Sequence, residues 1–254
     1  YICNIPCVES NISYNIKPRP ILKTVPLDFV EGKLINKEKK LYDVGRETAG
    51  YLRVRFHVLK PGTAKIAYGQ HITDGDVRYA IGDRKFMINF ELTKGEHEFE
   101  QYFIRISGRY IQAFLPEGIE IVSVGIIPYI YPLTVKDFRL KNSLDQNIYD
   151  VCIHTLRLCM NLHYEDTPWR EQALYVLDSR NQMLCGYFAF KETDFARANL
   201  ELIAKGTRDD GLLELTYPSV DGPAIPFFSV MYPVEVYEYI KYTGDKSILE
   251  TTMP

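Results

Sequence analysis

Ile130-Tyr131-Pro132-Leu133-Thr134-Val135-Lys136 separates two parts of the 254-residue sequence that have different periodicities. Before this segment, short runs of β-branched and aromatic residues alternate with polar residues, which is typical of antiparallel strands. After it, apolar residues recur at intervals of three and four, which is typical of amphipathic helices. We therefore predict a β domain at residues 1–133, with an N-terminal extension at residues 1–38, and a helical domain at residues 134–254.

The first part contains several strand-like runs joined by turn-forming residues. Clear examples are residues 50–56, 64–68 and 86–92. Lys60-Pro61-Gly62 and Lys94-Gly95-Glu96 separate such runs, and each combines residues that favour hairpin turns, because Pro fixes φ and Gly accepts positive φ. The number of runs fits an antiparallel β-sandwich.

The second part predicts four helices in succession. The first starts near Ser143 and carries an apolar stripe made of Leu144, Ile148, Val151, Cys152, Thr155, Leu156 and Cys159. The second is expected to start at Thr167-Pro168, with Thr as the N-cap and Pro in the first turn. The third begins near Thr193-Asp194, and the fourth covers about residues 229–242. Helices without intervening strands indicate helical hairpins, a bundle or an α/α barrel, of which this chain would hold the opening part.

Composition excludes several functional classes. The chain has 30 Lys and Arg against 33 Asp and Glu, so it lacks the basic surplus that nucleic-acid binding requires. No run approaches the ~20 apolar residues of a membrane-spanning helix. The Cys and His spacings predict no metal site. No targeting segment is recognisable, which favours the cytoplasm, although the compartment stays open.

The densest polar segment is residues 164–172, which contains the only Trp of the chain, Trp169. Its acids could be ordinary first-turn charges that favour a helix N-terminus. Alternatively, Glu171 and Asp178, seven residues apart, share one face of the predicted second helix. Two acids, an Arg and a Trp suit a sugar site, because the indole stacks on a pyranose and a carboxyl can protonate a leaving oxygen. A second candidate is the Pro-rich loop at residues 217–229, which could equally be a rigid surface connection.

The segment from Glu165 to Asp178, EDTPWREQALYVLD, resembles the signature of bacterial α-L-rhamnosidases. In that signature an Asp-Cys-Pro opening is followed by a Glu and then by Gly-Asp. Residues 42–47 and 50–52 are similar to the family's β-sandwich, and Gly211-Leu212-Leu213 is similar to its later helices. The resemblance covers most of the chain from about residue 17 onward.

This resemblance implies an antiparallel β-sandwich followed by the first helices of an (α/α)6 barrel, in a glycoside hydrolase that removes terminal α-L-rhamnose with inversion and needs no cofactor. It implies that Glu171 is the general acid. The substrate-binding residues that it implies are Asp166, Trp169, Arg170, Tyr175 and Asp178. In the family the general base comes from a much later helix, which has no counterpart before Pro254. The unfinished helical edge also predicts self-association into a homo-oligomer.

The sequence departs from the family signature at a few positions. Thr167 replaces Cys and Leu177 replaces Gly, while some members carry the acid where this chain has Gln172. One alternative is therefore a catalytically silent carbohydrate-binding or scaffold protein of the same fold. Another is a related barrel enzyme that acts on a different deoxy-sugar or on a uronic acid, which a basic pocket made by Arg170 and Arg180 would favour.

Overall fold

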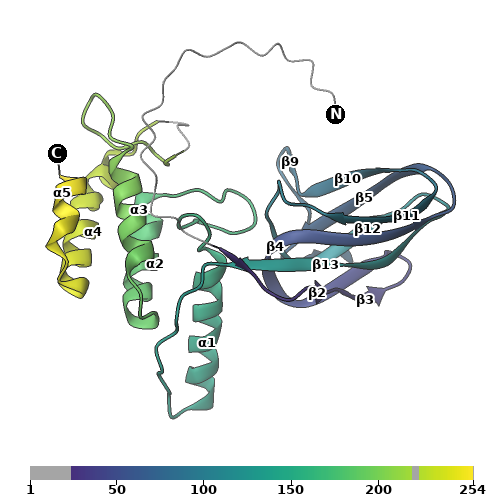
Figure 1. Cartoon of the computed structure of the whole chain (residues 1–254), viewed down its shortest axis with the longest axis horizontal. Helices are drawn as coiled ribbons and strands as arrows, with labels where there is room; N and C mark the ends of the chain where they lie inside the picture. Colours follow the sequence, from purple (N-terminus) through teal and green to yellow (C-terminus); the bar gives the residue numbers. More distant parts are fainter. Residues whose placement is uncertain (1–23, 219–222, 254) are drawn as a thin grey trace.

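The computed structural model describes residues 24–218 and 223–253 and shows strands followed by helices (Figure 1). The strands are β1 (Val25–Pro26), β2 (Val30–Glu31), β3 (Lys33–Asn36), β4 (Leu41–Val58), β5 (Gly62–Gly69), β6 (Ile72–Thr73), β7 (Asp76–Val77), β8 (Ala80–Ile81), β9 (Arg84–Lys85), β10 (Met87–Leu92), β11 (Gly95–Glu100), β12 (Ile106–Phe114) and β13 (Ile119–Ile130). Residues 1–23, which make up most of the predicted extension, lie outside the described residues. The remainder of that extension contains β1, β2 and β3, which pair with β13 and β4.

The long strand β4 takes part in both layers of the β-sandwich. Its first half pairs with β3 and β12, and its second half pairs with β11 and β13. All these pairs are antiparallel. Alternation along β4 directs Leu52, Val54 and Phe56 inward, where they are fully buried, while Arg55 is exposed. The predicted strands at residues 50–56, 64–68 and 86–92 correspond to β4, β5 and β10.

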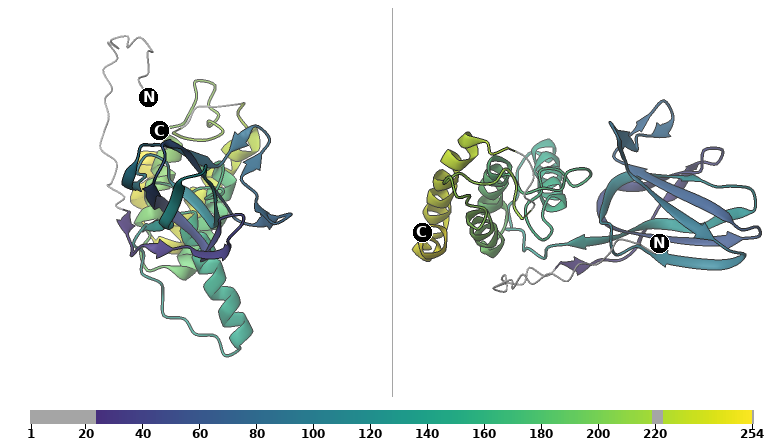
Figure 2. Two further views of the ribbon diagram at one scale, coloured as in Figure 1. Left: turned by 90° about the vertical axis from the view of Figure 1, so that its right-hand side faces the viewer. Right: turned by 90° about the horizontal axis from the view of Figure 1, so that it is seen from above.

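The helices are α1 (Ser143–Leu158), α2 (Val176–Ala189), α3 (Asp194–Ala204), α4 (Pro226–Thr243) and α5 (Leu249–Thr252), with a 3-10 turn, η1 (Lys246–Ile248), before α5. Asn142 caps α1 by accepting a hydrogen bond from the N–H of Leu144. Gly244 ends α4 in the left-handed conformation that favours glycine. The start of α1 and the end of α4 agree with the predicted start near Ser143 and the predicted end near residue 242, whereas α4 begins three residues before the predicted 229. Figure 2 shows the sandwich and the helices at opposite ends of the molecule.

The predicted apolar stripe of α1 is only partly buried. Leu156 and Cys159 lie in the core, but Leu144, Ile148 and Val151 are more than half exposed. Figure 1 shows the reason, because the N-terminal part of α1 extends away from the sandwich and from α2. The spacing therefore predicted the helix correctly and its burial incorrectly.

The predicted start of the second helix at Thr167 is wrong. Residues 168–171 form a turn, and α2 begins at Val176 after an extended Tyr175. The helix signals of Thr167 and Pro168 are local, whereas Trp169 is buried in the hydrophobic core of the sandwich. Burying a large aromatic ring stabilises a fold by more than the few tenths of a kcal/mol per residue that favour a helical turn.

A buried ion pair joins the sandwich to the helices. Arg105, just before β12, donates from Nη1 to Glu165 Oε2 at 2.6 Å and from Nη2 to the carbonyl of Leu158 at 2.9 Å. Both side chains of the ion pair are almost fully buried. Burial raises the pKa of the Glu165 carboxyl, and the Arg105 guanidinium opposes this rise. The two parts of the chain are thus packed together at Glu165, the residue that precedes Asp166 in the sequence.

Candidate functional site

The site lies in the loop that connects α1 to α2 and in the first turn of α2. Asp166 and Ala173 close this loop, because the N–H of Asp166 donates to the carbonyl of Ala173 at 3.0 Å and the N–H of Ala173 donates to Asp166 Oδ1 at 3.0 Å. Gln172 has a φ of 53°, in the left-handed region, which reverses the chain between them. The loop therefore returns toward Asp166 before α2 begins.

This geometry brings three predicted carboxylates together. Burial raises the pKa of Asp166, and the negative charges of Glu171 and Asp178 raise it further. Burial also raises the pKa of Asp178, and the charge of Glu171 adds to the effect. Such mutual repulsion requires the carboxylates to be near one another. The sequence predicted this grouping for a wrong reason, since Glu171 is in the turn and does not share a helix with Asp178.

Tyr175 and Arg170 are also at this cluster. The Tyr175 hydroxyl donates to Glu171 Oε2 at 3.0 Å, and Arg170 Nε lies 4.0 Å from Glu171 Oε1. The Glu171 side chain is about one-third exposed, so solvent or a ligand can reach it. The ring centroids of Tyr175 and Phe228 lie 6.4 Å apart, and the two rings are nearly perpendicular. Phe228 is in the first turn of α4. Phe228 belongs to the second candidate loop, of which residues 219–222 lie outside the described part of the chain.

Trp169 does not join the other predicted site residues. Its side chain is only 5% exposed and packs in the sandwich core, with its ring centroid 4.5 Å from that of Phe86. A ring in this position has no free face on which a sugar could stack. No local pattern indicates this placement, because a Trp beside carboxylates is equally compatible with a stacking role and with an anchoring role.

Gln172 and Arg180 have structural partners. The Gln172 amide donates to the carbonyls of Pro168 at 2.7 Å and Arg105 at 3.3 Å. Arg180 donates to both carboxylate oxygens of Glu238 on α4, at 2.8 and 2.5 Å. This ion pair removes Arg180 from the basic pocket that a uronic acid would need. Leu177, which occupies the family's Gly position, is partly buried next to Asp178.

Sequence reasoning missed Glu235, an acid on α4. Its side chain is 1% exposed, and Oε1 lies 2.8 Å from the hydroxyl of Ser179 on α2, while Oε2 has no hydrogen-bond partner among the described residues. Burial raises the pKa of Glu235 to about 8. Position Ser179 is adjacent to Asp178, so this contact fixes the turn of α2 that carries Asp178. The spacing of apolar residues in α4 could have placed Glu235 on a buried face. However, α4 is apolar on most of its surface, so the spacing does not show which face is buried.

No group of three or more His, Cys, Asp or Glu side chains in the described residues has a metal-binding arrangement. In the same part of the chain, none of the helices combines the length and apolar character that crossing a membrane requires.

Residues 134–254 match the family model of the bacterial α-L-rhamnosidase six-hairpin glycosidase domain. The helical part of the chain is therefore similar to this family. The match begins directly after β13 and includes the whole carboxylate cluster. The predicted resemblance to bacterial α-L-rhamnosidases is thus confirmed.

Solved structures of rhamnosidases have the same fold. The GH78 family rhamnosidase of Bacillus sp. GL1 is 23% identical, with a TM-score of 0.73 over 82% of this chain and 22% of that one. The Streptomyces avermitilis α-L-rhamnosidase complexed with L-rhamnose is 17% identical, with a TM-score of 0.75 over 91% and 24%. A Klebsiella oxytoca rhamnosidase with rhamnose bound is 19% identical, with a TM-score of 0.69 over 82% and 45%.

These similarities confirm the predicted fold, a β-sandwich followed by the first helices of a helical barrel. The chain spans between about a fifth and a half of the length of these three rhamnosidases. A comparison with curated protein sequences gave no significant match.

Proposed function

We propose that this rhamnosidase-family chain forms part of a glycoside hydrolase that removes terminal α-L-rhamnose with inversion. The observation that carries the proposal is the convergence of Asp166, Glu171 and Asp178 where the α1–α2 loop meets α2. Carboxylates grouped in this way can accept hydrogen bonds from sugar hydroxyls and can supply a proton to a glycosidic oxygen. The family of the helical part and the rhamnose bound in two of the similar structures support the same substrate class.

Glu171 takes the role of general acid in this proposal. It is the most exposed of the three acids, the Tyr175 hydroxyl donates to its Oε2, and Arg170 Nε lies 4.0 Å from its Oε1. Asp166 and Asp178 are held by the loop and by α2, which suits them to bind sugar hydroxyls. Because burial and repulsion raise their pKa values, their carboxylates are stronger hydrogen-bond acceptors than exposed ones.

Gln172 supports the assignment of Glu171 as the acid. Its amide donates to the backbone carbonyls of Pro168 and Arg105, so Gln172 shapes the turn. Its neighbour Glu171 is the residue of the two that belongs to the carboxylate cluster. Inversion also requires a second carboxylate, roughly 6.5 to 9.5 Å from the acid, to activate water from the opposite side of the sugar. We propose that another part of the full-length protein supplies it.

The test is Glu171→Gln in the full-length protein, assayed on an aryl α-L-rhamnoside. We expect kcat to fall by about 10² to 10⁴, because the amide cannot donate the proton to the leaving oxygen. Glu120→Gln, an exposed acid on β13, is the matched control and should keep normal activity. Proton NMR of the first sugar released should show the β-anomer.

Near-normal turnover of Glu171→Gln would remove Glu171 from the acid role. If the unmodified protein binds L-rhamnose in calorimetry but hydrolyses no rhamnoside, the catalytically silent alternative is correct.

A further inference from the structure

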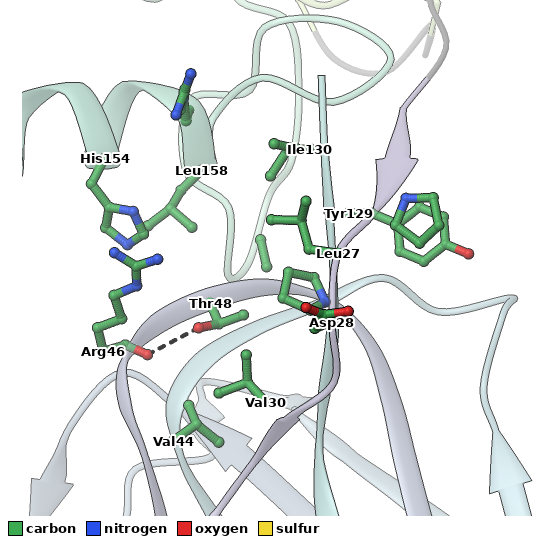
Figure 3. Close-up of a pocket in the computed structure, with 14 residues that line it drawn as sticks. Leu27, Asp28, Val30, Val44, Arg46, Thr48, Tyr129, Ile130, His154 and Leu158 are labelled. Carbon is green, nitrogen blue, oxygen red and sulfur yellow. Dashed lines mark hydrogen bonds between the residues drawn. The ribbon is translucent and has the colours of Figure 1, made fainter. Parts of the chain in front are cut away.

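A cavity of about 710 Å³ lies at the junction of the sandwich and α1, away from the carboxylate cluster (Figure 3). Residues from β1, β2, β4, β13 and α1 line it, and none of them comes from residues 160–178. Ligand sites commonly lie between domains and have volumes of roughly 300 to 1,000 Å³. The size and the position of this junction pocket are therefore those of a small-molecule site.

Two nitrogen-bearing side chains converge at one end of the junction pocket. Figure 3 shows Arg46 of β4 and His154 of α1 extending toward each other. The His154 Nε2 donates to the carbonyl of Glu47 at 2.8 Å, which fixes the ring and leaves Nδ1 for another partner. No described residue forms a hydrogen bond or an ion pair with the Arg46 guanidinium.

The nearest acid in sequence does not neutralise Arg46. The Glu47 carboxylate accepts from Gln70 Nε2 at 2.7 Å and from Ser107 Oγ at 2.9 Å, both in the sandwich. Arg157 brings a second guanidinium to the pocket. Its Nη2 donates to the carbonyl of Leu133 at 2.7 Å, and its buried Nε has no partner among the described residues.

The rest of the pocket is mainly aliphatic. Leu27, Val30, Val44 and Leu158 form much of its wall, and Asp28 is the one carboxylate among its lining residues, against two guanidinium groups. In Figure 3, Asp28 lies across the pocket from Arg46 and His154. A neutral sugar would place many hydroxyl groups against this aliphatic wall and leave them without partners. An anion with an apolar body would satisfy both the wall and the cations.

We propose that the junction pocket binds an organic carboxylate with an apolar body. The carboxylate lies between Arg46 and His154, where the guanidinium can form charge-assisted hydrogen bonds. The apolar body lies on the aliphatic side chains of β2, β4 and α1. This site is independent of the proposed hydrolysis, because it shares no residue with the carboxylate cluster.

Cinnamate is a suitable probe, and its binding to the full-length protein can be measured by calorimetry with saturating L-rhamnose present. We expect saturable binding that weakens about tenfold or more in Arg46→Gln, because the charged hydrogen-bond donor is lost. Arg46→Lys should retain part of the affinity. Arg55→Gln, an exposed arginine further along β4, should bind cinnamate as the unmodified protein does.

Cinnamyl alcohol, which has the same body without the charge, should bind at least tenfold more weakly than cinnamate. Equal binding of the acid and the alcohol, equal binding by Arg46→Gln, or no saturation at millimolar cinnamate would each overturn the proposal. Loss of cinnamate binding when L-rhamnose is added would place cinnamate at the carboxylate cluster and would also overturn it. Arg46 is exposed and its guanidinium has no partner among the described residues, so we expect its substitution to leave the fold intact.

Discussion

Asp166, Glu171 and Asp178 owe their proximity to a loop that is fixed at both ends. The backbone of Asp166 pairs with Ala173, and Trp169 between them is anchored in the sandwich core. The motif led us to predict these acids as site residues from the sequence. It could not predict the burial of Trp169, because Phe86, which packs against the ring, lies between β9 and β10, far from Trp169 in the sequence, and nothing local indicates the contact.

The first prediction concerns Trp169 as an anchor. We expect Trp169→Ala to lower the free energy of unfolding by about 3 to 5 kcal/mol, since it removes a buried ring. Trp169→Phe should cost clearly less, because a ring remains beside Phe86 and the lost indole N–H has no partner among the described residues. Denaturant unfolding measures both effects. If Trp169→Phe keeps normal stability but raises KM for a rhamnoside about tenfold, the indole contacts the sugar.

At the scale of elements, α2 and α4 position the site through paired contacts. Ser179 and Arg180 of α2 meet Glu235 and Glu238 of α4. Sequence periodicity predicted the existence of the helices and the end of α4 near residue 242. It misplaced the N-cap of α2 by eight residues, at Thr167 instead of Tyr175, because tertiary packing of the preceding turn overrode the local capping signals.

The second prediction concerns the pH dependence of stability. The pKa of Glu235 is about 8 in the folded protein against the ordinary 4.5, so the folded state binds its proton more tightly than the unfolded state. Its contribution to stability is therefore full below about pH 4.5 and is lost as the pH rises to about 8. Glu235→Gln should remove this loss, so the stability difference between the two proteins should change by up to about 1.4 kcal/mol per pH unit in that window.

Chemical denaturation at pH 5, 6, 7 and 8 measures the effect of Glu235→Gln, with the exposed Glu250→Gln as control. A constant difference across the four pH values would show that Glu235 titrates normally in the folded protein.

At the scale of the whole molecule, the sandwich and the helices meet at a buried interface. The composition and the change of period at residue 132 predicted two structural parts in this order. They could not predict the contact between them, because Arg105 and Glu165 are 60 residues apart and each is an ordinary charged residue in its own segment. The interface places the sandwich against the loop that carries the acids.

The third prediction concerns this ion pair. Arg105→Met alone should destabilise the protein by about 3 to 5 kcal/mol, because it leaves the Glu165 carboxyl buried without its partner. Arg105→Met combined with Glu165→Met should recover most of that loss. A double-mutant cycle from denaturant unfolding gives the coupling. Additive effects of the two substitutions would show that the side chains do not interact.

The most direct test of the central claim is a crystal structure of the full-length Glu171→Gln protein with an aryl α-L-rhamnoside bound. We predict that the rhamnose hydroxyls lie within hydrogen-bond distance of Asp166 and Asp178, with the glycosidic oxygen next to the side chain at position 171. A rhamnoside bound elsewhere, with these three side chains hydrogen-bonded only to water or to protein, would contradict the account.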